Sequence, residues 1–221
     1  MVKKGVYFGE IHSYKDLGLV LSSVDISPAK PKTNYVDIPG GDGSADLTNV
    51  HGEVKFSMRT MKFTFVMNPS GDLSEAAWES KKTEISNLLN GIHFERITLD
   101  KDSDYFYTGR CTVDSWQSDR RVRTFVVSAS VFPYKHKQTE TVATFDLSAT
   151  ARNVTIQNSR KSVIPEIVCS NDNCIVACGG YSVSMKAGTH KFLEIQFVEG
   201  ANIVSISGTG TVSFRFREGD L

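Results

Sequence analysis

Three aspartates at alternate positions, Asp100, Asp102 and Asp104, are the residues of this sequence most suited to holding a metal ion. In a calcium-binding loop such carboxylates stand at the first, third and fifth positions, where they supply oxygen ligands. The same loop needs a glycine at the sixth position for its turn and a glutamate at the twelfth as a bidentate ligand. Those positions hold Tyr105 and Cys111. The spacing therefore favours an acidic hairpin turn over a calcium site.

Three cysteines, Cys169, Cys174 and Cys178, offer a second set of metal ligands, while Cys111 stands apart. Structural zinc sites use four ligands and usually include a closely spaced cysteine pair. Cys174 and Cys178 are the most closely spaced pair, and the next histidine, His190, is twelve residues further on. On a strand these two cysteines would share one face and pack as small hydrophobic side chains. We expect no metal site here and no disulfide framework.

Signatures of catalysis are missing from the sequence. The glycine-rich residues 39–43 (Pro-Gly-Gly-Asp-Gly) lack the Gly-Lys-Ser/Thr of a phosphate-binding loop. Neither a Gly-x-Ser-x-Gly elbow nor a His-Glu-x-x-His motif occurs. The five histidines are scattered, and nothing selects a glycosidase pair among the 25 acidic residues. We therefore expect no catalytic residue, no cofactor-binding residue, no cofactor and no enzymatic activity.

The densest basic cluster is Asp-Arg-Arg-Val-Arg at residues 119–123. Strand alternation would place Arg121 and Arg123 on one face, where they could contact an acidic partner or phosphate. The solvated end of a hairpin is the simpler interpretation. The aromatic platforms that bind sugars generally use Trp or Tyr, but Trp78 and Trp116 both lie in the first part of the chain.

Composition narrows the class of protein. The 221 residues include 25 basic and 25 acidic side chains, for a net charge of zero, which argues against a dedicated nucleic-acid binder. At 40% hydrophobic residues the chain can bury a core. No segment approaches the roughly 20 apolar residues of a membrane helix, and the start lacks the apolar run of a signal peptide. We expect synthesis in a cytosol without membrane insertion.

Hydrophobic alternation predicts a mainly β fold. Residues 105–116 and 121–132 predict two long strands joined by a polar turn. Residues 53–67 also alternate, but the apolar positions change parity between Met58 and Met61. A strand cannot change faces without an extra residue, so we expect a bulge or tight bend near residues 59–60.

One amphipathic helix is predicted over about residues 73–90. Asp72 is a candidate N-cap with Glu75 at capping-box spacing, and Gly91 suits the C-terminal end. An apolar stripe should lie on the sheet; it consists of Ala77, Trp78, Ile85, Leu88 and Leu89.

Two domains are expected, with a polar boundary near residues 136–141. Residues 1–138 would form a β-sandwich or split-barrel-like domain carrying the helix. Residues 139–221 contain short apolar segments separated by turn formers, a pattern typical of a small β-sandwich.

Several motifs, in this order, resemble the distal tail protein of bacteriophages with long, non-contractile tails. The resemblance begins with Phe8-Gly-Glu and Leu17-Gly-Leu and continues with Pro31 and the loop at residues 39–43 followed by Asp46-Leu47. Four further segments match and extend the resemblance over essentially the whole chain: residues 89–91, 105–107, 132–135 (Phe-Pro-Tyr-Lys) and 216–221.

The resemblance implies a structural virion protein of a phage or prophage. Its first domain would form a ring, expected to be a hexamer, at the distal end of the tail. That ring would join the tail tube protein to the tail-tip protein and to receptor-binding proteins of the baseplate that serve host attachment. The second domain would be a galectin-like or carbohydrate-module-like sandwich. The expected location is the virion tail tip, after assembly in the bacterial host cytoplasm, with no sequence-specific binding of nucleic acid.

Two other functions remain open on the sequence. Residues 139–221 could act as a carbohydrate-binding module that contacts host cell-wall glycans. A hydrolase of cell-wall glycans or peptides is the least favoured, because no acidic pair is singled out.

Overall fold

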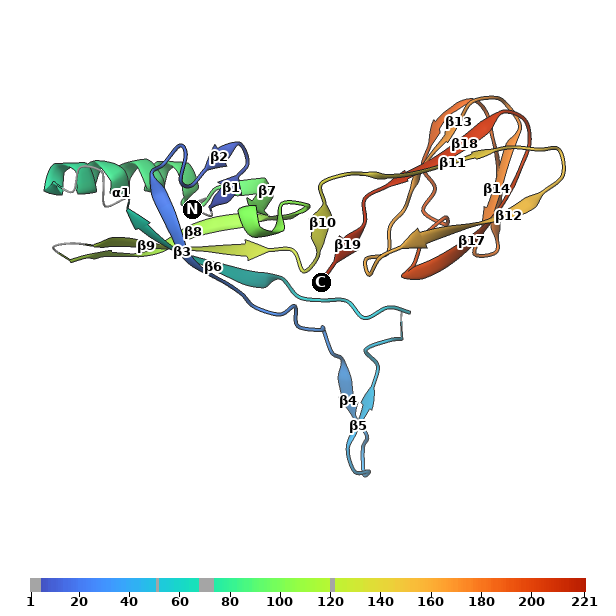
Figure 1. Cartoon of the computed structure of the whole chain (residues 1–221). Coiled ribbons are helices and arrows are strands. Elements are labelled where there is room, and N and C mark those ends of the chain that lie inside the picture. Colours follow the sequence, from blue (N-terminus) through green and yellow to red (C-terminus); the bar gives the residue numbers. More distant parts are fainter. Residues whose placement is uncertain (1–4, 51, 68–73, 120–121) are drawn as a thin grey trace. The chain divides into compact units, whose positions relative to one another are not determined.

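A computed structural model describes residues 5–50, 52–67, 74–119 and 122–221 of the chain. The chain separates into two compact units, Met1–Lys135 and His136–Leu221. Figure 1 shows the first unit in blue to yellow-green and the second in yellow to red. The units are described in turn.

An antiparallel sheet forms the body of the N-terminal unit, in the strand order β2-β1-β7-β8-β9-β6-β3. Its strands are β1 (Val6–Phe8), β2 (Ile11–His12), β3 (Leu19–Ile26), β6 (Arg59–Met67), β7 (His93–Leu99), β8 (Tyr105–Ser118) and β9 (Arg123–Val131). The two long strands predicted from alternation are confirmed as β8 and β9, which pair from Gly109↔Val131 to Ser118↔Arg123. A single 3-10 turn, η1 (Asp100–Asp102), separates β7 from β8.

The predicted bulge or tight bend near residues 59–60 is wrong. Strand β6 begins at Arg59 and pairs with β9 in unbroken register. The residues before it do not continue the strand: Phe56 makes only an isolated bridge to Pro31, and Met58 is exposed. The change of parity therefore marks the place where the chain enters the sheet. A register shift does occur where β6 pairs with its other neighbour, β3. It lies on β3, between Leu21 and Ser23.

The predicted helix is confirmed as α1 (Glu75–Leu89). Its N-cap is Ser74, whose Oγ accepts a hydrogen bond from the amide of Ala77 at 3.2 Å. The expected cap, Asp72, lies outside the described residues. The helix buries Trp78, and the ring centroid of Trp78 lies 4.7 Å from that of Phe125 in β9. This contact fixes the helix on the sheet. Figure 1 shows α1 lying along the sheet of its unit.

A small hairpin stands apart from this sheet. Among the strands that the structure describes, β4 (Tyr35–Asp37) and β5 (Ser44–Asp46) pair with each other and with no other strand. They lie in the segment between β3 and β6, and Figure 1 shows the hairpin extending away from the sheet of its unit. We call residues 31–56 the arm, since the Pro31–Phe56 bridge closes its base.

The C-terminal unit is a β-sandwich of two four-stranded antiparallel sheets, in the orders β11-β18-β13-β16 and β12-β17-β14-β15. Its first sheet contains β11 (Thr141–Asp146), β13 (Glu166–Cys169), β16 (Gly188–His190) and β18 (Thr211–Phe216). Its second contains β12 (Arg152–Asn158), β14 (Cys174–Cys178), β15 (Tyr181–Met185) and β17 (Gly200–Ser207). Two short strands, β10 (Lys135–Lys137) and β19 (Gly219–Asp220), pair with each other. The expected sandwich is therefore confirmed.

Candidate binding sites and interaction surfaces

Two of the three aspartates at calcium-like spacing, Asp100 and Asp102, are held by different partners. The Asp100 carboxylate accepts a hydrogen bond from the amide of Gly5 at 2.7 Å and faces the His12 ring. Asp102 instead forms an ion pair with Lys135, at 3.0 Å between Nζ and Oδ2. Within the described residues, no group of three His, Cys, Asp or Glu side chains is placed to hold a metal ion.

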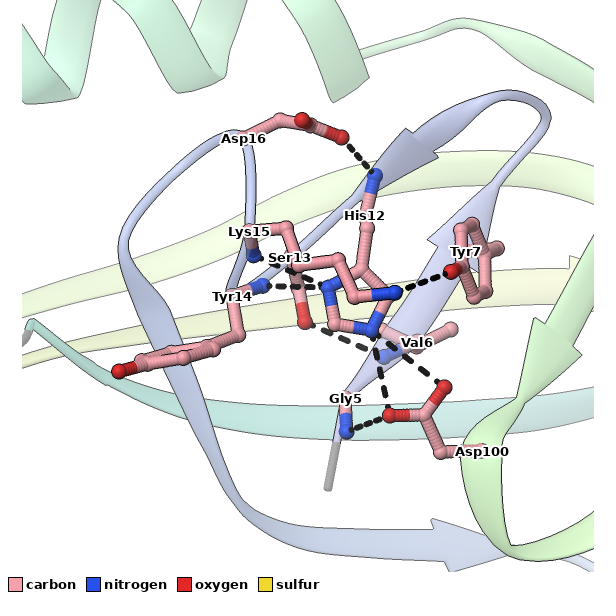
Figure 2. A network of polar contacts seen from close by, with 9 residues as sticks. All are labelled: Gly5, Val6, Tyr7, His12, Ser13, Tyr14, Lys15, Asp16 and Asp100. Atoms are coloured by element: carbon pink, nitrogen blue, oxygen red, sulfur yellow. Dashed lines mark hydrogen bonds and ion pairs between the residues drawn. The ribbon is translucent and has the colours of Figure 1, made fainter. Parts of the chain in front are cut away.

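His12 is the centre of a buried polar network in the N-terminal unit (Figure 2). The side chain is 2% exposed. Its Nδ1 accepts hydrogen bonds from the backbone amides of Tyr14 and Lys15, at 3.2 and 3.0 Å. Because Nδ1 is an acceptor, the ring proton of a neutral imidazole sits on Nε2, which donates to Asp100 at 3.2 Å.

The network has a structural purpose. Both ring nitrogens of His12 are used within the chain, so the imidazole has no free nitrogen with which to act as a general base. The residues around it are held in the same way: Ser13 Oγ accepts from the amide of Val6, and Asp16 accepts from the amide of His12. The network ties the first two strands to η1. No motif in the sequence points to it.

The cysteines are core residues. Cys174 and Cys178 lie on one buried face of β14, and Cys169 is buried at the end of β13. Burial raises the pKa of the Cys174 thiol to about 12, and the pKa values of Cys169 and Cys178 are raised for the same reason. Burial also raises the pKa of Cys111 to about 12. A protonated, buried thiol is neither a good nucleophile nor a metal ligand.

The interpretation of the basic cluster as a solvated hairpin end is wrong for Arg123. This residue is buried; its Nη2 lies 3.3 Å from Glu75 Oε2, and its guanidinium lies 5.2 Å from the centre of the Trp78 ring. It therefore helps to hold α1 on the sheet. Arg121 lies outside the described residues. Trp78 is itself buried, so it offers no platform to a sugar.

The glycine-rich loop lies at the tip of the arm, between β4 and β5. Gly40 and Gly43 have φ values of +74° and +78°, which turns favour in glycine. The loop thus serves a turn, and strand β5, rather than a phosphate-binding helix, follows it directly.

Exposed apolar side chains gather on the arm. Tyr35 is 60% exposed, and Val36 and Ile38 are each 48% exposed. Tyr35 and Val36 are adjacent in β4 and so point to opposite faces, which means that neither face of the hairpin is covered. Leu47 and Val50 extend the exposed apolar surface along the returning segment.

A cavity of about 420 Å³ lies in the C-terminal unit. Its lining is dominated by charged side chains: Glu140, Lys161, Glu166, Lys191, Arg215 and Arg217. No motif in the sequence indicates this cavity, because its residues come from strands β13 and β18 and from the loops around residues 161 and 191.

Comparison with known structures gives the fold. The chain superposes on the Dit protein of SPP1 with a TM-score of 0.68, over 99% of each chain and at 14% sequence identity. The chain has the Dit fold. The SPP1 protein is described as a paradigm of the hub adsorption apparatus of phages that infect Gram-positive bacteria. No protein-family model and no curated protein matched the sequence.

The Dit fold confirms the predicted fold class: a mainly β chain with one helix on its N-terminal sheet and a C-terminal sandwich. SPP1 Dit, a solved protein with this fold, is described as part of a hub adsorption apparatus. In the described part of this chain, no helix has the length and apolar character required to cross a membrane.

Proposed function

We propose that this protein is a structural hub component of a phage or prophage tail tip. The observation that carries the proposal is the likeness to SPP1 Dit, which extends over 99% of both chains and so includes both units and their order. The motifs of the distal tail proteins found in the sequence support the same assignment. We place the protein in the virion, after assembly in the host cytoplasm.

We further propose that the N-terminal unit, predicted to extend to residue 138, assembles into a homo-oligomeric ring, expected to be a hexamer. A closed ring needs a heterologous interface, in which two different patches of each subunit meet. The arm offers one patch, because its β4–β5 hairpin is exposed on both faces and carries Tyr35, Val36 and Ile38. An isolated two-stranded hairpin is only marginally stable in water, so a neighbouring subunit would stabilise it.

The edges of the large sheet offer the second patch. Strands β2 and β3 end the strand order, so each has one edge that pairs with no other strand among the described residues of this sheet. Strand addition along such an edge is a common way for two chains to associate. In this proposal the ring also binds the tail tube protein, the tail-tip protein and receptor-binding proteins.

A structural role agrees with the state of the reactive side chains. His12 is held by three polar contacts, Asp102 is paired with Lys135, and the cysteines are buried with raised pKa values. These contacts support stability and not turnover.

The carbohydrate-module alternative is not favoured. The C-terminal unit contains no tryptophan, and charged groups dominate the lining of its cavity. The aromatic ring in that lining, Phe216, is buried in the sandwich core.

The proposal is tested with the full chain by native mass spectrometry and by binding to purified tail tubes. A hexamer that decorates tube ends is the expected result. A chain that stays monomeric at micromolar concentration and leaves tube ends bare would contradict the assignment as a ring-forming hub.

A further inference from the structure

The charged cavity of the C-terminal unit opens beside the outer face of one sheet of the sandwich. In β18, Phe214 and Phe216 point into the core, so the alternation turns Arg215 outward. Arg215 stands opposite Glu166 of β13 in the strand register. Lys161 and Lys191 also line the cavity, and each comes from a loop.

Three of the four cations of the cavity, Lys161, Lys191 and Arg215, form no ion pair with a carboxylate in the part of the chain that the structure describes. This holds for Arg215 even though it faces Glu166 across the strand pair. Lys161 Nζ lies 2.7 Å from Nε2 of His136, to which it donates a hydrogen bond. The fourth cation, Arg217, donates to the backbone carbonyls of Lys137 and Gln138 at 2.5 Å each and so is fixed in place.

The charge of the lining favours an anion. Four cationic and two carboxylate side chains leave a net positive lining. The histidine beside Lys161 does not offset this charge, and burial lowers the pKa of Lys161, which shows that its ammonium is poorly compensated. An anion close to Lys161 would relieve that cost.

We propose that this cavity binds an oxyanion, a phosphate or a carboxylate, carried by a larger polar ligand. Arg215 would supply the planar fork that matches two oxygens of such a group, and Lys161 and Lys191 would supply point charges. A volume of about 420 Å³ exceeds what a single oxyanion fills. The neighbouring Glu166 and Gln196 are placed to accept or donate hydrogen bonds to hydroxyl or amide groups of the rest of the ligand.

The test measures binding of inorganic phosphate to the full chain by isothermal titration calorimetry at low ionic strength. The variant Arg215→Gln with Lys191→Gln removes two exposed cations of the cavity without touching the core. The matched control is Arg152→Gln with Lys186→Gln, which removes the same charge from exposed positions of the same unit outside the cavity.

Saturable binding at one site per chain is expected, with a loss of about tenfold in affinity for the cavity variant and none for the control, because each cation contributes a charge-assisted hydrogen bond. Absence of saturation at millimolar phosphate, or an equal loss in both variants, would overturn the proposal. Circular dichroism melting of the variants separates lost binding from lost folding.

Two further probes identify the source of the oxyanion. Glycerol phosphate represents a phosphate-bearing polymer, and an oligoglutamate peptide represents an acidic protein segment. If either probe competes with inorganic phosphate, the site is supported, and the stronger competitor indicates which kind of ligand carries the oxyanion. If neither probe competes, a site for a larger ligand is contradicted. Ring assembly is measured separately, so failure here leaves the hub proposal standing.

Discussion

The Nε2 atom of His12 lies 3.2 Å from Oδ2 of Asp100, although the two residues are 88 positions apart in the sequence. The same carboxylate accepts the amide of Gly5 at 2.7 Å. One side chain from η1 thereby fixes both ends of the β1–β2 segment. In a buried place such contacts are costly to break, because the remaining partner keeps its desolvation cost without its hydrogen bond.

Replacing His12 with Ala should lower the free energy of unfolding of the N-terminal unit by about 2–3 kcal/mol, since three polar contacts are lost in a buried place. The free energy of unfolding is measured in urea, with the fluorescence of Trp78 and Trp116 as the signal. The control is His93→Ala, which removes an exposed histidine near Glu95 and should cost less than about 0.5 kcal/mol. Equal losses in the two variants would contradict the role assigned to the network.

Gly5→Ala tests the packing around the same ring. A Cβ atom at residue 5 would lie 2.6 Å from Cε1 and 2.7 Å from Nε2 of His12. The ring must then move, and its contact with Asp100 should lengthen. We expect a loss of about 2 kcal/mol in unfolding free energy. Combined with His12→Ala, which removes the clashing ring, Gly5→Ala should cost much less, and a fully additive double-mutant cycle would refute the clash.

The contact between His12 and Asp100 also shows what local patterns cannot reveal. Strands β8 and β9 and helix α1 were predictable, because each shows its hydrophobic periodicity within one continuous segment of the sequence. The pairing of His12 with Asp100 depends on the order of strands β1 and β7 in the sheet, and no spacing records that order. The charged cavity was hidden for the same reason, since Lys161, Lys191 and Arg215 meet only in the folded sandwich.

Two errors have equally physical causes. The apolar alternation before Met61 includes Phe56, at the base of the arm, and Met58, which precedes strand β6. Neither residue belongs to the strand, so the parity rule for a single strand does not apply to them. Arg123 was expected in solvent because arginine usually is. It is buried because Glu75 and the Trp78 ring on α1 satisfy its charge, and those partners are far from it in sequence.

The stability of the C-terminal unit should decrease on acidification through His136. Burial, followed by the charges of Lys161 and Arg217, lowers the pKa of His136 to about 4, from an ordinary value of 6.5. Between these two values the unfolded chain binds a proton that the folded chain does not, so stability falls as the pH falls from about 6.5 to about 4 and is unaffected above that window. The loss is about 1–2 kcal/mol once solvent screening of the partly exposed ring is allowed for.

The variant His136→Gln keeps an acceptor for Lys161 but cannot take up this proton. The difference in unfolding free energy between the variant and the parent chain, measured in urea at several pH values, should therefore change across that window. A constant difference would show that the histidine titrates alike in the folded and unfolded chain.

The thiols should be unreactive in the folded protein. The pKa values of Cys111 and Cys174 are raised to about 12 by burial, so almost no thiolate exists near neutral pH. A disulfide reagent such as Ellman's should release colour slowly until denaturant is added, and then titrate all four cysteines. Thr209→Cys, at an exposed loop position, provides the positive control and should react at once. Rapid reaction of the parent chain would mean that the core opens readily.

The arm should control self-association. Replacing Tyr35, Val36 and Ile38 together with Thr keeps strand propensity in β4 but removes the apolar surface that is exposed on both faces of the hairpin. We expect the dissociation constant of the oligomer to rise by about 100-fold or more, because interface energy is concentrated in a few large apolar side chains. Analytical ultracentrifugation across a range of protein concentrations measures this change.

The matched control carries Thr at Val142, Ile175 and Ile203, which are exposed apolar residues of the C-terminal unit. This control removes similar apolar surface from a unit to which we assign no ring contact, so its dissociation constant should stay within about twofold of the parent chain. If only the control variant raises the dissociation constant, the ring interface lies on the C-terminal sandwich and not on the arm. If the arm variant assembles as well as the parent chain, its apolar side chains contribute nothing to the interface. That result would contradict the assignment of the arm to the ring interface.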